Sequence, residues 1–340
     1  MSGIVMMIIA IVVLGGAYLL YGRYLQNKWG IDPKAKTPAY EMEDGVDYVP
    51  ADTNVVFGHQ FASIAGAGPI NGPIQAAIFG WLPVMLWILI GGVFFGAVQD
   101  FASMYASVKN KGRTIGYIIE AYIGKLGKKL FLLFCWLFCI LVVAAFADVV
   151  AGTFNGFVAD NAGTVTRVAA NGAVATTSML FIIEAVGLGF FLKYSKFNKW
   201  INTAVAILLL VLAIALGLKF PVYVSLGTWH IIIFAYILVA SVAPVWALLQ
   251  PRDYLNSYLL IFMIVGAVIG VFAANPSCNL KAFTSFNVDG QYMFPILFVT
   301  IACGAVSGFH SLVSSGTASK QIKNEKNMLP VSFGAMLMES

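Results

Sequence analysis

Charged side chains are scarce in this sequence. Lysine and arginine contribute 20 residues and aspartate and glutamate 15, so charged residues make up 10% of the 340, against about 25% in typical soluble domains. Hydrophobic residues make up 60%, more than a soluble protein of this length can hide in one core. A bilayer accepts apolar side chains on every face of a helix. The composition therefore predicts an integral membrane protein.

Cysteine is also sparse, with four residues at positions 135, 139, 278 and 303. None of them forms a CxxC pair or a metal-ligand spacing. Cys135 and Cys139 lie one helical turn apart in an apolar run, which is typical of small packing residues. We expect no metal and no cofactor.

Signatures of catalysis are missing as well. The sequence has no HExxH, no GxSxG and no P-loop, and Gly66-Ala-Gly68 lacks the third glycine of a dinucleotide-binding loop. Nothing favours an intramembrane hydrolase. No long basic run with interleaved aromatic residues accompanies the net charge of +5. We therefore expect that the protein is not an enzyme and has no catalytic residues. We also expect that it does not bind nucleic acid.

Nine apolar segments are long enough to cross a bilayer, which takes about 20 residues per helix. Lipid offers no partner for a free backbone N–H or C=O, so all nine are expected to be helices. The expected fold class is all-α, a polytopic transmembrane bundle. The segments are 3–22, 55–79, 81–98, 130–150, 174–192, 200–218, 228–249, 255–274 and 294–318.

Basic residues divide unequally between the predicted loops. With the N-terminus outside, 17 lysines and arginines fall on the cytoplasmic side and only three, Arg167, Lys219 and Lys281, on the other. This asymmetry follows the positive-inside rule. It also favours two crossings within 55–98, because one crossing would place the most basic loop outside. We interpret 3–22 as an uncleaved first span.

The most informative stretch is residues 58–73, GHQFASIAGAGPINGP. Its four glycines and two prolines make an uninterrupted helix unfavourable. Irregular backbone at membrane depth must be buried in protein or line a cavity, and broken helices bind substrates and ions in many transporters. An ordinary kink or a tight turn is the alternative. The substrate-binding candidates here are His59, Gln60, Ser63, Gly66, Gly68 and Asn71.

A second interruption is expected in the seventh segment, at SVAPVW from Ser241 to Trp246, because Pro244 should break a helix. Ser241 and Trp246 are further substrate-binding candidates, although Trp246 fits the interfacial aromatic belt equally well. Two broken spans five helices apart are typical of inverted-repeat transporters.

That pattern predicts one transmembrane domain over 1–340. It would consist of an extra N-terminal helix (3–22), a first five-helix repeat (55–218) and an incomplete second repeat (228–340).

Polar residues form a stripe in the ninth segment. Ser307, His310, Ser311, Ser314 and Ser315 recur at three- and four-residue spacing, which places them on one helix face. Such a face must meet protein or water. Two interpretations are equally favoured: packing of small and hydroxyl residues between helices, and an ion or substrate site. For the second, the candidates for ion or proton coupling are His310, Ser311, Ser314 and Ser315.

Ionisable residues at membrane depth are functional candidates because they are costly there. Asp148 and Glu184 lie in apolar segments, and Asp148 is a candidate proton carrier. The alternative is that either one lies near a helix end and reaches the headgroups. Asp100 and Asp253 fall at predicted cytoplasmic helix ends, where gating or structural ion pairs are expected. His59 could titrate near neutral pH, and polar packing is equally credible.

Three motifs carry a resemblance to a known family. Residues 58–70 (GHQFASIAGAGPI), Gln99-Asp100 and residues 308–317 (GFHSLVSSGT) resemble the carbon starvation protein A (CstA) family. The resemblance runs from about residue 4 to the C-terminus. Family members continue with further helices beyond the position of Ser340, so we interpret the chain as C-terminally truncated.

The resemblance implies a multi-pass transporter of a bacterial or archaeal inner membrane, taking up peptides or pyruvate during carbon starvation. It implies a LeuT-like core broken at the substrate site, here Ser63–Gly72, with hydroxyls of Ser311, Ser314 and Ser315 near a cation. The expected partners are the lipid bilayer, the small-molecule substrate and a coupling proton or sodium ion. A channel or a nutrient sensor without coupled transport is the alternative.

Overall fold

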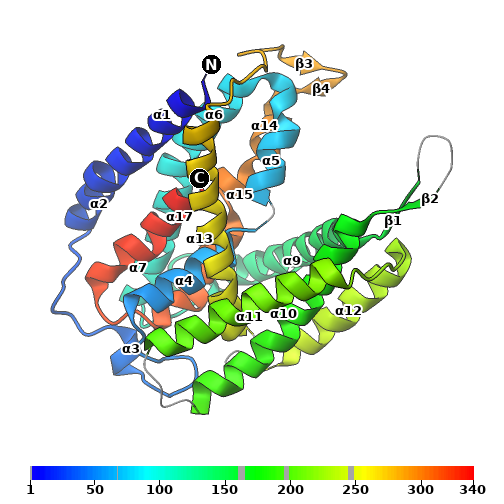
Figure 1. Cartoon of the computed structure of the whole chain (residues 1–340). Coiled ribbons are helices and arrows are strands. Elements are labelled where there is room, and N and C mark those ends of the chain that lie inside the picture. Colours follow the sequence, from blue (N-terminus) through cyan, green and yellow to red (C-terminus); the bar gives the residue numbers. More distant parts are fainter. Residues whose placement is uncertain (1, 67, 160–164, 195–198, 244–248) are drawn as a thin grey trace. The chain divides into compact units, whose positions relative to one another are not determined.

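The computed structural model describes residues 2–66, 68–159, 165–194, 199–243 and 249–340, and most of its elements are helices (Figure 1). The chain forms two compact units. The first unit comprises Met1–Lys128 and Leu260–Ser340, and the second comprises Lys129–Leu259. These units follow contacts in space and do not coincide with the expected sequence repeats, which stay a prediction.

The N-terminal part of the first unit is a series of helices. They are α1 (Gly3–Gly16), η1 (Ala17–Gly22), α2 (Arg23–Lys28), α3 (Pro38–Glu41), α4 (Thr53–Ile64), α5 (Gly68–Ala76), η2 (Ala77–Phe79), α6 (Trp81–Gly91), η3 (Gly92–Ala97), α7 (Val98–Lys109) and α8 (Ile115–Tyr122).

The C-terminal part of the first unit begins within α13 (Leu249–Ala274) and includes a two-stranded antiparallel hairpin. Its elements are β3 (Asn287–Val288), β4 (Gln291–Tyr292), α14 (Met293–Thr300), α15 (Ala302–Ala305), α16 (Gly308–Gly316), η4 (Ala318–Lys320), η5 (Glu325–Asn327), η6 (Leu329–Gly334) and α17 (Ala335–Glu339).

The second unit is built from α9 (Lys125–Phe154), α10 (Ala169–Tyr194), α11 (Lys199–Lys219), α12 (Leu226–Val242) and the start of α13. An antiparallel hairpin of β1 (Phe157–Ala159) and β2 (Val165–Arg167) joins α9 to α10. Helices α10 and α11 lie side by side. Gly217 permits this close approach, because a Cβ there would collide with Thr177 and lie 2.8 Å from the Ala173 carbonyl.

Six helices in the described part of the chain are long and apolar enough to cross a membrane. Each one covers most or all of a predicted span. The other three predicted segments contain shorter helices, since two are divided and the third ends at Val242 after 17 residues. The count of nine spans therefore stays a prediction. The six helices are Gly3–Lys28, Trp81–Lys109, Lys125–Phe154, Ala169–Phe191, Ile201–Lys219 and Leu255–Ala274.

The predicted interruption of the second segment is confirmed. Helix α4 ends at Ile64, Ala65 leaves the helical region with a ψ of 74°, and α5 begins at Gly68. In the seventh segment α12 ends at Val242, and Ala243 is extended. Pro244 and Trp246 lie outside the described residues.

The ninth segment is also divided, which its sequence pattern did not indicate. Helix α15 ends at Ala305, Val306 and Ser307 are non-helical, and α16 begins at Gly308. The two divided segments pack together, because α5 contacts α14 and α15 while α4 contacts α16. Figure 1 shows α5 beside α14 and α15. The first unit therefore contains two breaks in contacting segments, one between α4 and α5 and the other between α15 and α16.

An aromatic and methionine core fixes α7 in the first unit. Phe101, Met104, Phe333 and Met336 are fully buried in one cluster that joins α7 to η6 and α17. Trp29 stacks on Phe101 with ring centroids 4.8 Å apart. Tightly packed interiors of this kind allow little movement of individual side chains, so polar groups on the inner face of α7 have fixed neighbours.

An ion pair ties the end of α7 to the segment before α17. The Nζ atom of Lys109 lies 2.7 and 2.8 Å from the two carboxylate oxygens of Glu325. The same carboxylate accepts the backbone N–H of Asp32 at 3.0 Å. The Glu325 side chain is only 4% exposed. Three distant parts of the chain therefore meet at one buried carboxylate.

We predict that Lys109→Met lowers the free energy of unfolding by about 3 kcal/mol, because it leaves a buried carboxylate without its cation. Thermal unfolding of the purified protein in detergent measures the effect. Lys323→Met is the matched control, since the pair of Lys323 with Asp52 is 36% and 52% exposed, and exposed pairs add little. Equal losses in the two variants would contradict the assignment.

Candidate functional site

Where the two divided segments pack together, the N-terminal end of α5 lies against α15, and α4 contacts α16. Small residues permit the close packing. A Cβ at Gly68 would lie 2.5 Å from the Cβ of Cys303, and one at Gly304 would lie 3.3 Å from the Cα of Pro69. Glycine at position 68 is therefore required by contact with α15.

Some residues near both breaks are accessible. Gly66, Asn71 and Gly308 are exposed, and Ser63 and Ser307 are half-buried. The first N–H groups of a helix have no acceptor within the helix, and they carry the positive end of its dipole. The arrangement can therefore receive a carboxylate at α5 or α16. Of the candidates, Ser63, Gly66, Gly68 and Asn71 all lie at this break.

Gln60 connects the two divided segments. Its side chain is fully buried on α4, and its Nε2 atom donates to the Ser314 hydroxyl on α16 at 2.8 Å. The Oε1 atom of Gln60 is buried and has no hydrogen-bond partner in the described part of the chain. An unpartnered buried oxygen is costly. Gln60 thus combines a packing contact with one free acceptor near the break.

Two serines of the stripe on α16, Ser314 and Ser315, face protein. The Ser107 hydroxyl on α7 donates to the Ser319 hydroxyl at 2.8 Å, and its oxygen lies 3.0 Å from the Ser315 carbonyl oxygen. Ser314 and Ser315 are buried, and Ser311 donates to the Gly308 carbonyl at 2.8 Å. These contacts show the packing role that was one of the two alternatives. A cation site at these hydroxyls stays a prediction.

His310 lies in a buried cluster with two carboxyl groups. Its Nδ1 atom is 3.5 Å from Asp100 Oδ2 and 3.1 Å from the sulfur of Met336, and its Nε2 atom is 3.4 Å from Glu339 Oε2. All three ionisable side chains are 1% exposed. Of the sequence candidates for coupling, His310 is the one that the structure places beside other buried titratable groups.

Sequence reasoning missed the two carboxyl groups of this cluster. Asp100 was expected at a helix end because the hydropathy falls at residue 98, but the helix continues without a break to Lys109. Asp100 is therefore buried within a helix. Glu339 follows a short apolar stretch, and no local pattern connects it to α16. The motif Gln99-Asp100 was the only available signal, and Gln99 donates to the Ser307 carbonyl at 3.0 Å.

The remaining candidates lie elsewhere. Asp148 is in the second unit, where its Oδ1 atom is 3.0 Å from His230 Nε2 and its side chain is 75% exposed. Its role in coupling stays a prediction. Ser241 donates to the Leu238 carbonyl at the end of α12, and Trp246 lies outside the described residues. His59 is half-buried on α4, next to Gln60.

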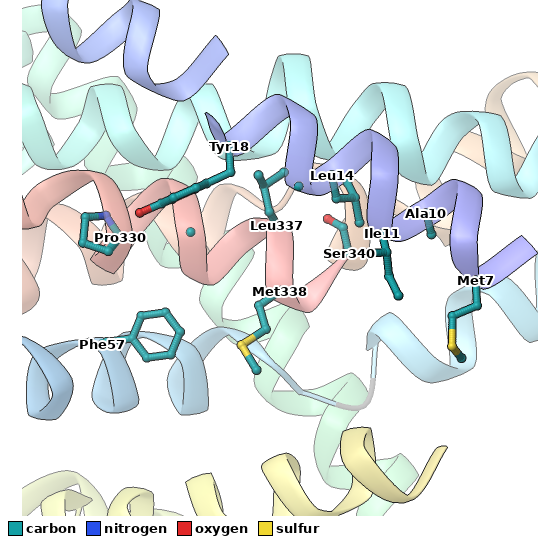
Figure 2. Close-up of a pocket in the computed structure, with 12 residues that line it drawn as sticks. Met7, Ala10, Ile11, Leu14, Tyr18, Phe57, Pro330, Leu337, Met338 and Ser340 are labelled. Atoms are coloured by element: carbon teal, nitrogen blue, oxygen red, sulfur yellow. The ribbon is translucent and has the colours of Figure 1, made fainter. Parts of the chain in front are cut away.

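A mostly apolar groove of about 580 Å³ runs between α1, α4 and α17 (Figure 2). Ile11 and Leu14 of α1, Phe57 of α4 and Leu337 of α17 line it. None of the candidate site residues contributes to its wall. A carboxylate-binding site needs several convergent polar groups, and this groove does not offer them.

Six helices in the described part of the chain are long and apolar enough to cross a membrane, and two divided segments pack against each other, which is typical of an α-helical membrane protein. The chain belongs to the family described as carbon starvation protein CstA, which it matches over residues 2–340.

Curated relatives include two proteins of Escherichia coli (strain K12). The peptide transporter CstA is 39% identical over 343 residues, covering 95% of this chain and 46% of that protein. The pyruvate/proton symporter BtsT is 37% identical over 340 residues, covering 95% of this chain and 45% of that protein. The chain spans about half the length of these relatives. No solved structure matches it.

We predict that Gly68→Ala destabilises the protein by about 1–3 kcal/mol, the usual cost of overpacking. The new methyl group would lie 2.5 Å from the Cβ of Cys303. Gly66→Ala is the control, because a Cβ at Gly66 meets nothing within 4 Å. The measurement is thermal unfolding in detergent. Similar unfolding temperatures for the two variants would show that α5 and α15 do not pack as described.

Proposed function

We propose that this chain forms the transmembrane part of a secondary active transporter that imports a small carboxylate-bearing nutrient during carbon starvation. The substrate would be a peptide, pyruvate or both, because a relative is named for each. Import would be proton-coupled, as the name of the symporter relative suggests. The protein would lie in a bacterial or archaeal inner membrane, with nine spans in this chain and the N-terminus outside.

The observation that carries this proposal is the packing of two broken segments against each other. Broken helices expose helix ends at membrane depth, where they can bind a solute that lipid would exclude. The N-terminal ends of α5 and α16 would receive the carboxylate, and the free Oε1 atom of Gln60 would accept a hydrogen bond from bound water or substrate. Both pyruvate and a peptide C-terminus present a carboxylate, so this feature serves either.

Transport would proceed by alternating access. Each divided segment consists of two short helices joined by a non-helical link, and such links can absorb backbone rotation while the helices stay rigid. The substrate site would then open to one side of the membrane at a time. A channel or a nutrient sensor is the second candidate, and it predicts non-saturating flux or binding without transport.

We predict saturable uptake of radiolabelled pyruvate or dipeptide into proteoliposomes of the purified protein under an inward proton gradient. Uptake should collapse when an uncoupler removes the gradient. Competition between pyruvate and peptides identifies the preferred substrate. Non-saturating flux would favour a channel, and binding without accumulation would favour a sensor.

We also predict that His310→Gln abolishes the dependence of uptake on the proton gradient. His59→Gln and Asp148→Asn test the other two coupling candidates in the same assay. The three initial rates are measured with and without the gradient. If all three variants keep gradient-dependent uptake, these residues do not carry the coupling proton.

A further inference from the structure

A group of titratable side chains in the first unit comes from three separate helices. Asp100 lies on α7, His310 on α16 and Glu339 on α17, and each side chain is 1% exposed. The imidazole stands between the two carboxyl groups, with one ring nitrogen toward each. The nearest oxygen–nitrogen distances are 3.5 and 3.4 Å, close enough for proton sharing after a small adjustment.

The cluster contains more acidic groups than cations to balance them. Neither carboxyl group accepts a hydrogen bond in the described part of the chain, and the Nε2 atom of His310 has no hydrogen-bond partner there either. Within that part, His310 is the one cationic group that approaches Asp100 or Glu339 to ion-pair distance. A protonated His310 can neutralise one carboxylate and leaves the other without compensation.

Other titratable groups on the surrounding elements do not supply the missing charge. Cys303 of α15 offers a neutral thiol within 4.8 Å, and α4 brings His59. Lys109 of α7 is held by Glu325, and Lys320 of η4 pairs with Asp47. Glu120 of α8 pairs with Lys128. The segments η3 and η6 contain no titratable residue.

An uncompensated charge in a buried, low-dielectric site is so costly that the group takes up a proton instead. Two acids that share one cation therefore hold one proton between them. We propose that Asp100, His310 and Glu339 form the proton-binding site of the transporter, in which an imidazolium pairs with one carboxylate and the other carboxyl group carries the exchangeable proton. This inference rests on the proposed function, because the proton is the coupling ion of that transport.

The location of the cluster suggests how the proton would affect transport. His310 is two residues from Gly308, where α16 begins directly after the break, so the helix that follows the break carries the imidazole. When the proton is bound, the cluster is neutral and can stay closed between α7, α16 and α17. Release of the proton leaves a net negative charge that favours entry of water and separation of these helices. Protonation thus biases α16 between two positions.

The first test separates transport from coupling. Glu339→Gln keeps the size and hydrogen-bonding capacity of the side chain but cannot release a proton. We expect this variant to retain exchange of labelled for unlabelled substrate across the membrane and to lose accumulation driven by a proton gradient. Glu43→Gln, the same change at an exposed carboxyl group, should retain both activities. Gradient-driven accumulation in Glu339→Gln would overturn the proposal.

The second test does not depend on transport. Infrared difference spectra of the purified protein between acidic and alkaline pH should contain the C=O band of a protonated carboxyl group. That band should disappear or shift in Glu339→Gln and in Asp100→Asn, and should remain in Glu43→Gln. A band unchanged in both cluster variants would overturn the proposal even if the wild type transports. If the wild type fails to transport but shows this band, the proposed function fails while the proton site stands.

A divalent metal is the competing occupant, because Cys303, His310 and Glu339 offer a thiol, an imidazole and a carboxylate within 4.8 Å of one another, and such donors suit zinc. Elemental analysis of the purified protein, before and after incubation with zinc, distinguishes the two cases. We expect the purified protein to contain no stoichiometric zinc, and we expect His310→Gln to leave its zinc content unchanged. Stoichiometric zinc that depends on His310 would replace the proton site with a metal site.

Discussion

The structure depends on one constraint, that backbone and side-chain polar groups at membrane depth must be satisfied inside the protein. Where α4 stops at Ile64 and α5 starts at Gly68, the chain exposes helix ends. A second broken segment packs beside the first, so that α5 contacts α15 and α4 contacts α16. Glycines at the contacts bring the backbones close, and the Gln60–Ser314 hydrogen bond joins α4 to α16.

The same constraint explains the buried acidic cluster. Charged Asp100 and Glu339 side chains would be too costly in lipid. Both lie beside the imidazole of His310, and no lysine or arginine pairs with them in the described part of the chain. By contrast, the Glu325 carboxylate forms an ion pair with the ammonium group of Lys109 and accepts a hydrogen bond from a backbone N–H. Glu325 therefore has a lysine as its partner, whereas in the described residues only His310 comes within ion-pair distance of Asp100 and Glu339.

The membrane class, the α4–α5 break and the polar face of α16 could be predicted from sequence, because hydropathy, proline and three- or four-residue spacing are local signals. Family membership could also be predicted, from motifs such as residues 308–317. The α15–α16 break could not, since neither Val306 nor Ser307 is a helix breaker. Asp100 was misplaced because hydropathy falls before the helix ends, and Glu339 reaches His310 only through tertiary packing.

The proposal that a substrate carboxylate binds at the N-terminal ends of α5 and α16 requires the α15–α16 break to be reached from water. Its most direct test places a single cysteine at Gly308, which is exposed, in protein whose four native cysteines have been replaced by alanine. We predict that a membrane-impermeant maleimide labels Gly308→Cys and that saturating substrate slows the labelling. A cysteine at the exposed loop position Glu43 should label at the same rate with or without substrate. Failure to label Gly308→Cys from either side, or labelling that substrate does not change, would contradict the account.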